Sequence, residues 1–116
     1  MVIETTEADA VDLVFRALAD ATRRDIVART MAGGQSVSTL ASHYAMSFPA
    51  VHKHIAVLER AGLVAKAREG REQLVRARVD EVRRASRLLD ELAGLWVARL
   101  DRLGGVVAEP EEGEGR

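Results

Sequence analysis

The sequence predicts a mainly α-helical domain that carries one small β-hairpin. The chain has 116 residues, of which 47% are apolar, so one domain with its own core fits its length. Ala, Leu, Arg and Glu are frequent, and these residues form helices readily. Two short segments on either side of Gly70 have strand character instead.

Four helices are expected before the hairpin, over residues 9–18, 21–32, 39–45 and 47–61. Asp9 or an acid nearby starts the first helix, and Asp20 and Ser38 are suitable N-caps for the second and third. In the fourth helix, Ser47 or Phe48 is the expected cap. Its first turn accepts a proline, here at position 49, and a glycine at position 62 follows its end.

The hairpin is predicted from the runs 63–68 and 72–79, and a long helix follows from Asp80 to Leu103. This organisation gives a flexible arm over residues 1–8, one domain over 9–105 and a disordered acidic tail over 106–116.

The net charge of −1 conceals an uneven distribution. Thirteen Lys or Arg and six acids lie between Arg23 and Arg87, whereas acids gather near both ends. A basic centre is compatible with a surface that binds phosphates, although a solvated charged surface is the alternative.

Several classes of protein do not fit the composition. The sequence has no Cys, which excludes disulfide scaffolds and thiolate metal sites. No apolar run reaches the roughly 20 residues that cross a bilayer. The first residues lack the pattern of a signal peptide, so a cytoplasmic protein is expected.

The third and fourth helices are separated by a tight turn, which is the pattern of a helix-turn-helix, and the hairpin that follows is a wing. Val51, Ile55 and Leu58 share one face of the fourth helix and are expected to be buried. The opposite face and the wing over residues 68–72 are expected to meet DNA. The predicted DNA contacts are Ser47, Phe48, Pro49, Ala50, His52, Lys53, His54, Arg68 and Arg71.

Three of these predictions involve specific chemistry. Free backbone N–H groups in the first turn of the fourth helix would favour a phosphate. Phe48 either touches a thymine methyl group or packs back as a hydrophobic staple. His54 either contacts DNA or is a partly buried side chain with local bonds.

The segment from Phe15 to Ile26 (FRALADATRRDI) resembles the opening of ArsR-type winged-helix repressors, and Met46 to Val64 resembles their recognition helix and entry into the wing. The resemblance implies a homodimer formed by the first and last helices, which reads an inverted repeat in double-stranded DNA. The expected interface residues are Val11, Val14, Leu88, Leu92, Leu95 and Trp96. The alternative is that the apolar stripe of the last helix packs on its own domain.

Metal sensing is not expected. Thiolate sensors of this family use a Cys pair in the first helix of the helix-turn-helix, and residues 40–45 contain none. The last helix has no His, and His52 and His54 point in different directions on their helix. We therefore expect no metal and no cofactor, and the Ser-Phe-Pro-Ala-Val pattern resembles a non-metal subgroup that includes autorepressors.

The leading hypothesis is thus a sequence-specific, homodimeric transcriptional repressor, with any inducer unknown. The alternative is a winged-helix protein-interaction module, motivated by the negative net charge and the acidic tail. An enzyme is not expected, because no catalytic motif has supporting context.

Overall fold

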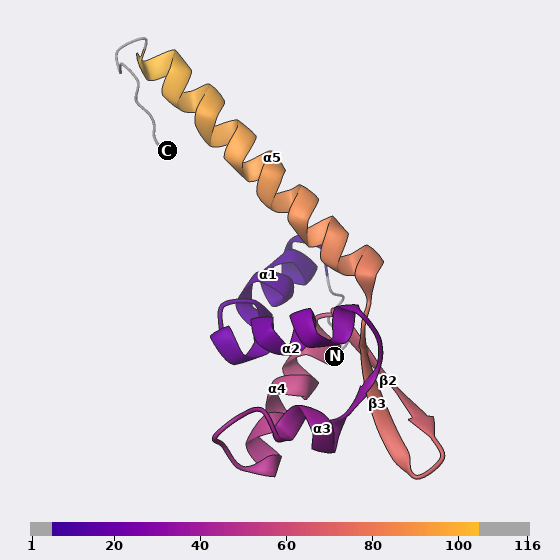
Figure 1. The fold of residues 1–116 in the computed structure, drawn as a ribbon. Helices are drawn as coiled ribbons and strands as arrows, with labels where there is room; N and C mark the ends of the chain where they lie inside the picture. Colours follow the sequence, from indigo (N-terminus) through magenta and orange to yellow (C-terminus); the bar gives the residue numbers. More distant parts are fainter. Residues whose placement is uncertain (1–5, 105–116) are drawn as a thin grey trace, which may run out of the picture. The chain divides into compact units, whose positions relative to one another are not determined.

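The computed structural model describes residues 6–104, which divide after Ala85 into two units. In the first unit, four helices lie beside a twisted hairpin (Figure 1). The elements are α1 (Glu7–Ala17), α2 (Ala21–Met31), β1 (Gln35–Ser36), α3 (Val37–Ala41), α4 (Phe48–Arg60), β2 (Val64–Glu69), β3 (Glu72–Ala77) and α5 (Val79–Gly104). The expected tail over residues 106–116 and the first five residues of the expected arm lie outside the described residues.

The first helix begins at Glu7, whereas the predicted flexible arm extended to residue 8. The Thr6 hydroxyl accepts a hydrogen bond from the Asp9 N–H at 3.0 Å, and the Asp9 carboxylate accepts from the Thr6 N–H at 3.4 Å. This capping box satisfies two backbone donors at once and starts α1 at Glu7.

The corner between α1 and α2 is held by side chains of α2. Asp20 caps α2, as predicted, by accepting from the Arg23 N–H at 3.0 Å. The Arg23 guanidinium donates to the carbonyls of Ala17 at 2.7 Å and Arg16 at 3.1 Å, and Arg24 donates to that of Leu18 at 2.8 Å. The two arginines therefore add donors to carbonyls at the end of α1, of which that of Arg16 also accepts from the Ala19 N–H at 3.2 Å.

The third helix differs from its prediction over residues 39–45. Ser36, not Ser38, is the N-cap, because its hydroxyl accepts from the Thr39 N–H at 3.1 Å, and α3 ends at Ala41. Beyond this point, hydrogen bonds from the His43 and Tyr44 N–H groups to carbonyls three residues back form turns instead of a continued helix.

A third strand was not predicted. Gln35 and Ser36 form β1, which pairs antiparallel with β3, so the sheet has the order β1-β3-β2. A strand of two residues is too short to show alternation in the sequence.

The fourth helix matches the prediction at both ends. Ser47 caps α4, with Pro49 in its first turn, and Gly62 follows with a φ of +80°. The left-handed conformation that ends a helix in this way is easily reached by glycine. The α3 and α4 helices and the turn between them confirm the helix-turn-helix.

The hairpin formed by β2, β3 and their turn is here called the wing. Its register pairs Val64 with Ala77 and Glu69 with Glu72, which leaves Gly70 and Arg71 as a two-residue loop. Gly70 has a φ of +60°, as such a tight loop requires. The second strand of the wing, β3, ends at Ala77 instead of residue 79, and α5 begins at Val79, just before the predicted start at Asp80.

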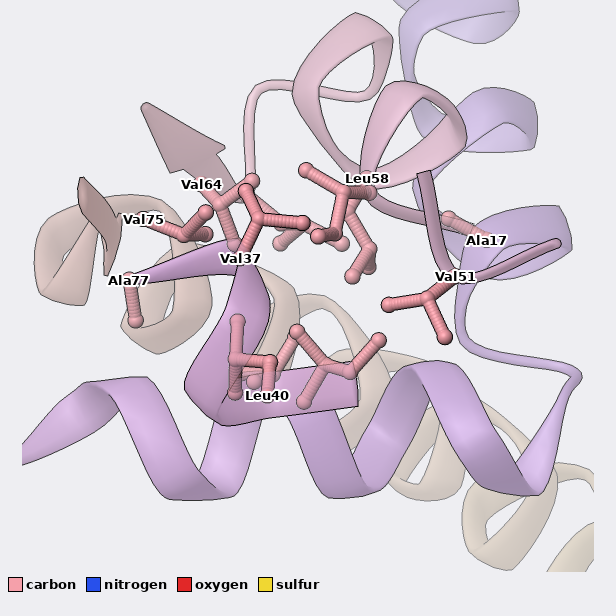
Figure 2. Close-up of a cluster of buried hydrophobic side chains, with 12 residues drawn as sticks. Ala17, Val37, Leu40, Val51, Leu58, Val64, Val75 and Ala77 are labelled. Carbon is pink, nitrogen blue, oxygen red and sulfur yellow. The ribbon is translucent and has the colours of Figure 1, made fainter. Parts of the chain in front are cut away.

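The core lies where α2, α3 and α4 meet the base of the wing (Figure 2). Val51, Ile55 and Leu58 are fully buried, which confirms the predicted inner face of α4. They pack with Ile26, Leu40 and Val75, among others. This packing determines which face of α4 is directed away from the core.

The second unit begins at Ser86 and its described residues belong to α5. Seven large apolar side chains of α5 are about half exposed or more in the single chain: Leu89, Leu92, Leu95, Trp96, Val97, Leu100 and Leu103. None of the helices in the described part of the chain is long and apolar enough to span a membrane.

Candidate nucleic-acid interface

A hollow of about 220 Å³ lies between the wing and the start of α4. Four of the predicted DNA-contact residues line it, namely Phe48 and His52 from α4 and Arg68 and Arg71 from the wing. Glu72, within the predicted wing over residues 68–72, also lines it, together with four residues that were not predicted: Ser36, Val37, Ser38 and Gln73. The hollow is therefore the place where the separately predicted helix and wing become one surface.

The first turn of α4 offers fewer backbone donors than predicted. The Ala50 N–H already donates a hydrogen bond to the Ser47 hydroxyl at 3.2 Å, and the Val51 N–H donates one to the Ser47 carbonyl at 3.1 Å. Pro49 has no N–H. The capping residue and the proline thus take two of the expected donors out of this turn, while the N–H of Phe48 has no bond within the described residues. A phosphate at this turn stays a prediction, and most of its donors would have to come from side chains.

Phe48 does not pack back into the core. Its side chain is 47% exposed, and its ring meets the His52 ring edge-on, with centroids 4.8 Å apart and an interplanar angle of 65°. Such an edge-to-face pair restricts both rings. The structure favours the exposed alternative for Phe48 over the hydrophobic staple.

The remaining positions of α4 separate into two groups. Ser47, Pro49 and Lys53 are exposed and Ala50 is half-buried, and none of the four lines the hollow. His54 instead lies against α2, where its Nδ1 is 3.2 Å from Nη1 of Arg23 and 3.8 Å from Oδ2 of Asp20. These contacts favour the local packing alternative for His54.

The two faces of the wing have different surroundings. Side chains alternate along a strand, so Arg68 shares a face with Lys66 and Val64, and their partners Gln73, Val75 and Ala77 share it too. Val64, Val75 and Ala77 are buried, so this is the inner face, directed to α4. Lys66 anchors it there through an ion pair of 3.3 Å with Glu59 of α4.

The loop between α3 and α4 is fixed by a polar cluster. The Tyr44 hydroxyl donates to the Asp25 carboxylate at 2.6 Å, and Arg29 donates to the same oxygen at 2.7 Å. Hydrogen bonds from Tyr44 and then Arg29 lower the pKa of Asp25 below its usual value. Burial, followed by the bond to Asp25, raises the pKa of Tyr44 to about 12. The cluster joins α2 to the turn that presents α4.

Comparison with known proteins agrees with this geometry. A family model described as a helix-turn-helix domain matches residues 18–67. The transcriptional repressor SdpR of Bacillus subtilis is 32% identical over 57 residues, which cover 49% of this chain and 63% of SdpR. The match therefore spans slightly less than two thirds of that relative.

Solved structures extend the likeness over most of the chain. An ArsR-like transcriptional regulator from Rhodococcus is 32% identical, with a TM-score of 0.71 over 87% of this chain and 95% of that one. A homodimeric winged helix-turn-helix domain of a possible ArsR-family regulator from Mycobacterium bovis has a TM-score of 0.63 at 24% identity, over 95% and 100%.

The fold and the hollow define a winged helix-turn-helix protein of the DNA-binding transcriptional regulator class. The chain belongs to the ArsR family of transcriptional regulators.

Proposed function

We propose that this chain is a homodimeric repressor that binds an inverted-repeat operator through α4 and the wing. The observation that carries the proposal is the hollow, where the exposed face of α4 meets two arginines of the wing. A helix of this kind fits the major groove, and basic side chains beside it bind the sugar-phosphate backbone.

The two parts of the surface have separate roles in this proposal. Base edges are read by Phe48, Ala50 and His52 at the start of the helix. The Phe48 ring is exposed and the His52 ring is half-buried, and the half-buried Ala50 is small enough for close approach. Lys53, Arg68 and Arg71, which are all exposed, bind phosphates and supply affinity that depends on salt.

The proposed dimer uses the apolar stripe of α5. Leu92, Leu95 and Trp96 are 47%, 67% and 61% exposed in the single chain, and large contiguous apolar surfaces usually mark an interface. We include Leu88 of the same helix and Val11 and Val14 of α1. The Mycobacterium bovis domain is homodimeric, which supports a dimer for this chain. A two-fold dimer would read half-sites about one DNA turn apart or a multiple of it.

Footprinting on the DNA upstream of the chain's own gene tests operator binding and autorepression together. We expect protection of an inverted repeat. The double variant K53A/R71A should bind more weakly to all duplexes and with a shallower salt dependence. Arg83→Ala, an exposed arginine outside the hollow, is the control.

Two results would contradict the proposal. Unchanged affinity in K53A/R71A would remove those residues from the interface. No binding of the wild-type protein to genomic fragments would favour the alternative of a protein-interaction module. We also propose that no metal controls binding, so adding a chelator should leave the footprint unchanged.

A further inference from the structure

We infer that the hollow between the wing and α4 is a seat for a single DNA phosphate, in which Gln73 and Ser38 are contact residues. This inference rests on the proposed function and names two residues that the sequence did not indicate. It follows from the register of the wing, the size of the hollow and the chemistry of its lining.

The register places a basic and an amide side chain side by side. Arg68 and Gln73 are directly opposite in the antiparallel pair. Opposite residues on one face have Cβ atoms about 5 Å apart, so both side chains can reach one ligand. They continue the inner face of the wing beyond the last buried pair and are exposed.

The other wall is formed by α3 and α4. Ser38 of α3 is exposed, and its hydroxyl is a hydrogen-bond donor. The neighbouring Ser36 hydroxyl is already donated to Oγ1 of Thr39 at 2.9 Å. Ser38 is therefore the serine of this wall that remains available to a ligand, and His52 closes the hollow on the α4 side.

The lining selects an anion. Arg68 and Arg71 are positive, and Gln73 and Ser38 add neutral donors. Glu72 also lines the hollow, although its pairing with Glu69 puts it in the register of the outer face, so the two arginines of the lining outnumber one carboxylate. A guanidinium fork beside neutral donors is suited to the oxygens of a phosphate.

The size of the hollow favours a small group. Its volume of about 220 Å³ is below the roughly 300–1,000 Å³ of pockets that enclose organic ligands. In the first turn of α4, the Ala50 N–H is bonded to Ser47 and Pro49 has no N–H, so side chains supply most of the donors here. A phosphate group of a DNA strand that runs between the wing and α4 fits these conditions.

The test places a carboxylate inside the seat and compares it with one outside. Gln73→Glu keeps the shape of the side chain and adds a negative charge on the inner face. Ala67→Glu adds the same charge on the outer face of the same wing, where Ala67 is exposed opposite Leu74. Affinity for a short duplex of fixed sequence is measured by fluorescence anisotropy at several salt concentrations, and thermal unfolding confirms that both variants are folded.

We expect Gln73→Glu to lose at least about tenfold more affinity than Ala67→Glu, because it places a charge against a phosphate. Gln73→Ala and Ser38→Ala should each weaken binding without changing the salt slope, since neither side chain is charged. Their effects should be less than additive if they share one phosphate. Arg68→Gln should reduce the slope by about 0.9.

Equal losses in Gln73→Glu and Ala67→Glu would overturn the seat and leave the proposed function standing. Failure of the wild-type protein to bind any duplex would reject the proposed function and the seat with it. The source of the phosphate is tested by titrating the protein with inorganic phosphate and following the Gln73 side-chain amide by NMR. Tight binding that displaces the duplex would overturn DNA as the ligand.

Discussion

The Arg23 guanidinium connects the end of α1 to α4, since its Nη1 lies 3.2 Å from Nδ1 of His54 while its Nε donates to the Ala17 carbonyl at 2.7 Å. A single side chain thus donates to two carbonyls at the end of α1 and contacts the proposed DNA-reading helix. The position of α4 depends in part on this contact.

We expect Arg23→Lys to destabilise the fold by about 1–2 kcal/mol, although it keeps the charge, because an ammonium cannot reproduce the guanidinium fork. Urea unfolding followed by circular dichroism measures the change. Arg16→Lys, an exposed arginine in the last turn of α1, should be near neutral. Equal unfolding midpoints for the two variants would contradict the bridging role of Arg23.

The cap of α2 should titrate. The hydrogen bond from the Arg23 N–H, before any other favourable contact, lowers the pKa of Asp20 below 3.8. A carboxyl with a lower pKa in the folded state stabilises it above the unfolded pKa, and this contribution disappears as the pH falls through the folded pKa.

Asp20→Ala should therefore cost about 1 kcal/mol at neutral pH, and the difference from wild type should shrink as the pH falls below 3.8. Asp20→Asn is the matched control, because asparagine caps helices well but does not titrate. A gap between wild type and Asp20→Ala that stays constant down to pH 2 would contradict this assignment.

The chain contains one Tyr, so its absorbance titration reports Tyr44 alone. Burial and the bond to Asp25 raise its pKa to about 12, above the ordinary value of 10.0. The folded pKa is the higher one, so the contribution to stability is complete below pH 10 and is lost as the pH rises towards 12.

Asp25→Asn should move the Tyr44 titration towards lower pH, since the carboxylate no longer disfavours the phenolate. Unfolded protein in urea gives the reference near pH 10. A wild-type midpoint equal to that reference would show that the phenol is not bonded to Asp25.

Because Tyr44 lies in the helix-turn-helix loop, Tyr44→Phe should also weaken DNA binding slightly while Arg83→Ala does not.

Phe48 and His52 should act as a pair on DNA. Their rings lie 4.8 Å apart, so removing one frees the other. In a double-mutant cycle with Phe48→Ala and His52→Ala, we expect a coupling of about 0.5–1.5 kcal/mol in duplex affinity. The pair Lys53 and Arg71, which have no such contact, is the control, and additive losses for Phe48 and His52 would argue against mutual positioning.

Self-association should depend on one face of α5. Leu92→Asp is expected to weaken the dimer at least about tenfold in sedimentation, because it places a charge in the apolar stripe. Gly94→Asp adds the same charge on the opposite side of the helix, where an added side chain meets open space, and should have little effect. The chain has one Trp, so Trp96 fluorescence gives a second measure, and an unchanged dimer in Leu92→Asp would exclude this face.

Local signals made α4 predictable. A capping serine, a proline in the first turn and a glycine after the end lie within the helix or beside it, so Ser47, Pro49 and Gly62 were sufficient. The third helix was misplaced because Ser36 and Ser38 are equally suitable caps in the sequence. The choice was decided by the pairing of Gln35 and Ser36 with β3.

The site was only partly predictable, because it depends on which side chains of distant segments meet. Phe48, His52, Arg68 and Arg71 were expected from charge and from the family resemblance. Gln73 and Ser38 carry no charge, and only the register of the wing brings Gln73 opposite Arg68. Applying strand alternation backwards from the buried Val75 would have assigned Gln73 to the inner face.

The two-residue turn at Gly70 and Arg71 limits how the wing can change in length. One residue added to β2 alone or to β3 alone would exchange the inner and outer faces of that strand. The side chain of Arg68 in β2, or of Gln73 in β3, would then point away from α4. Lengthening the tip by a matched residue in each strand would leave every existing pair in place. Viable relatives with longer or shorter wings should therefore differ by even numbers of residues unless a bulge absorbs the odd one.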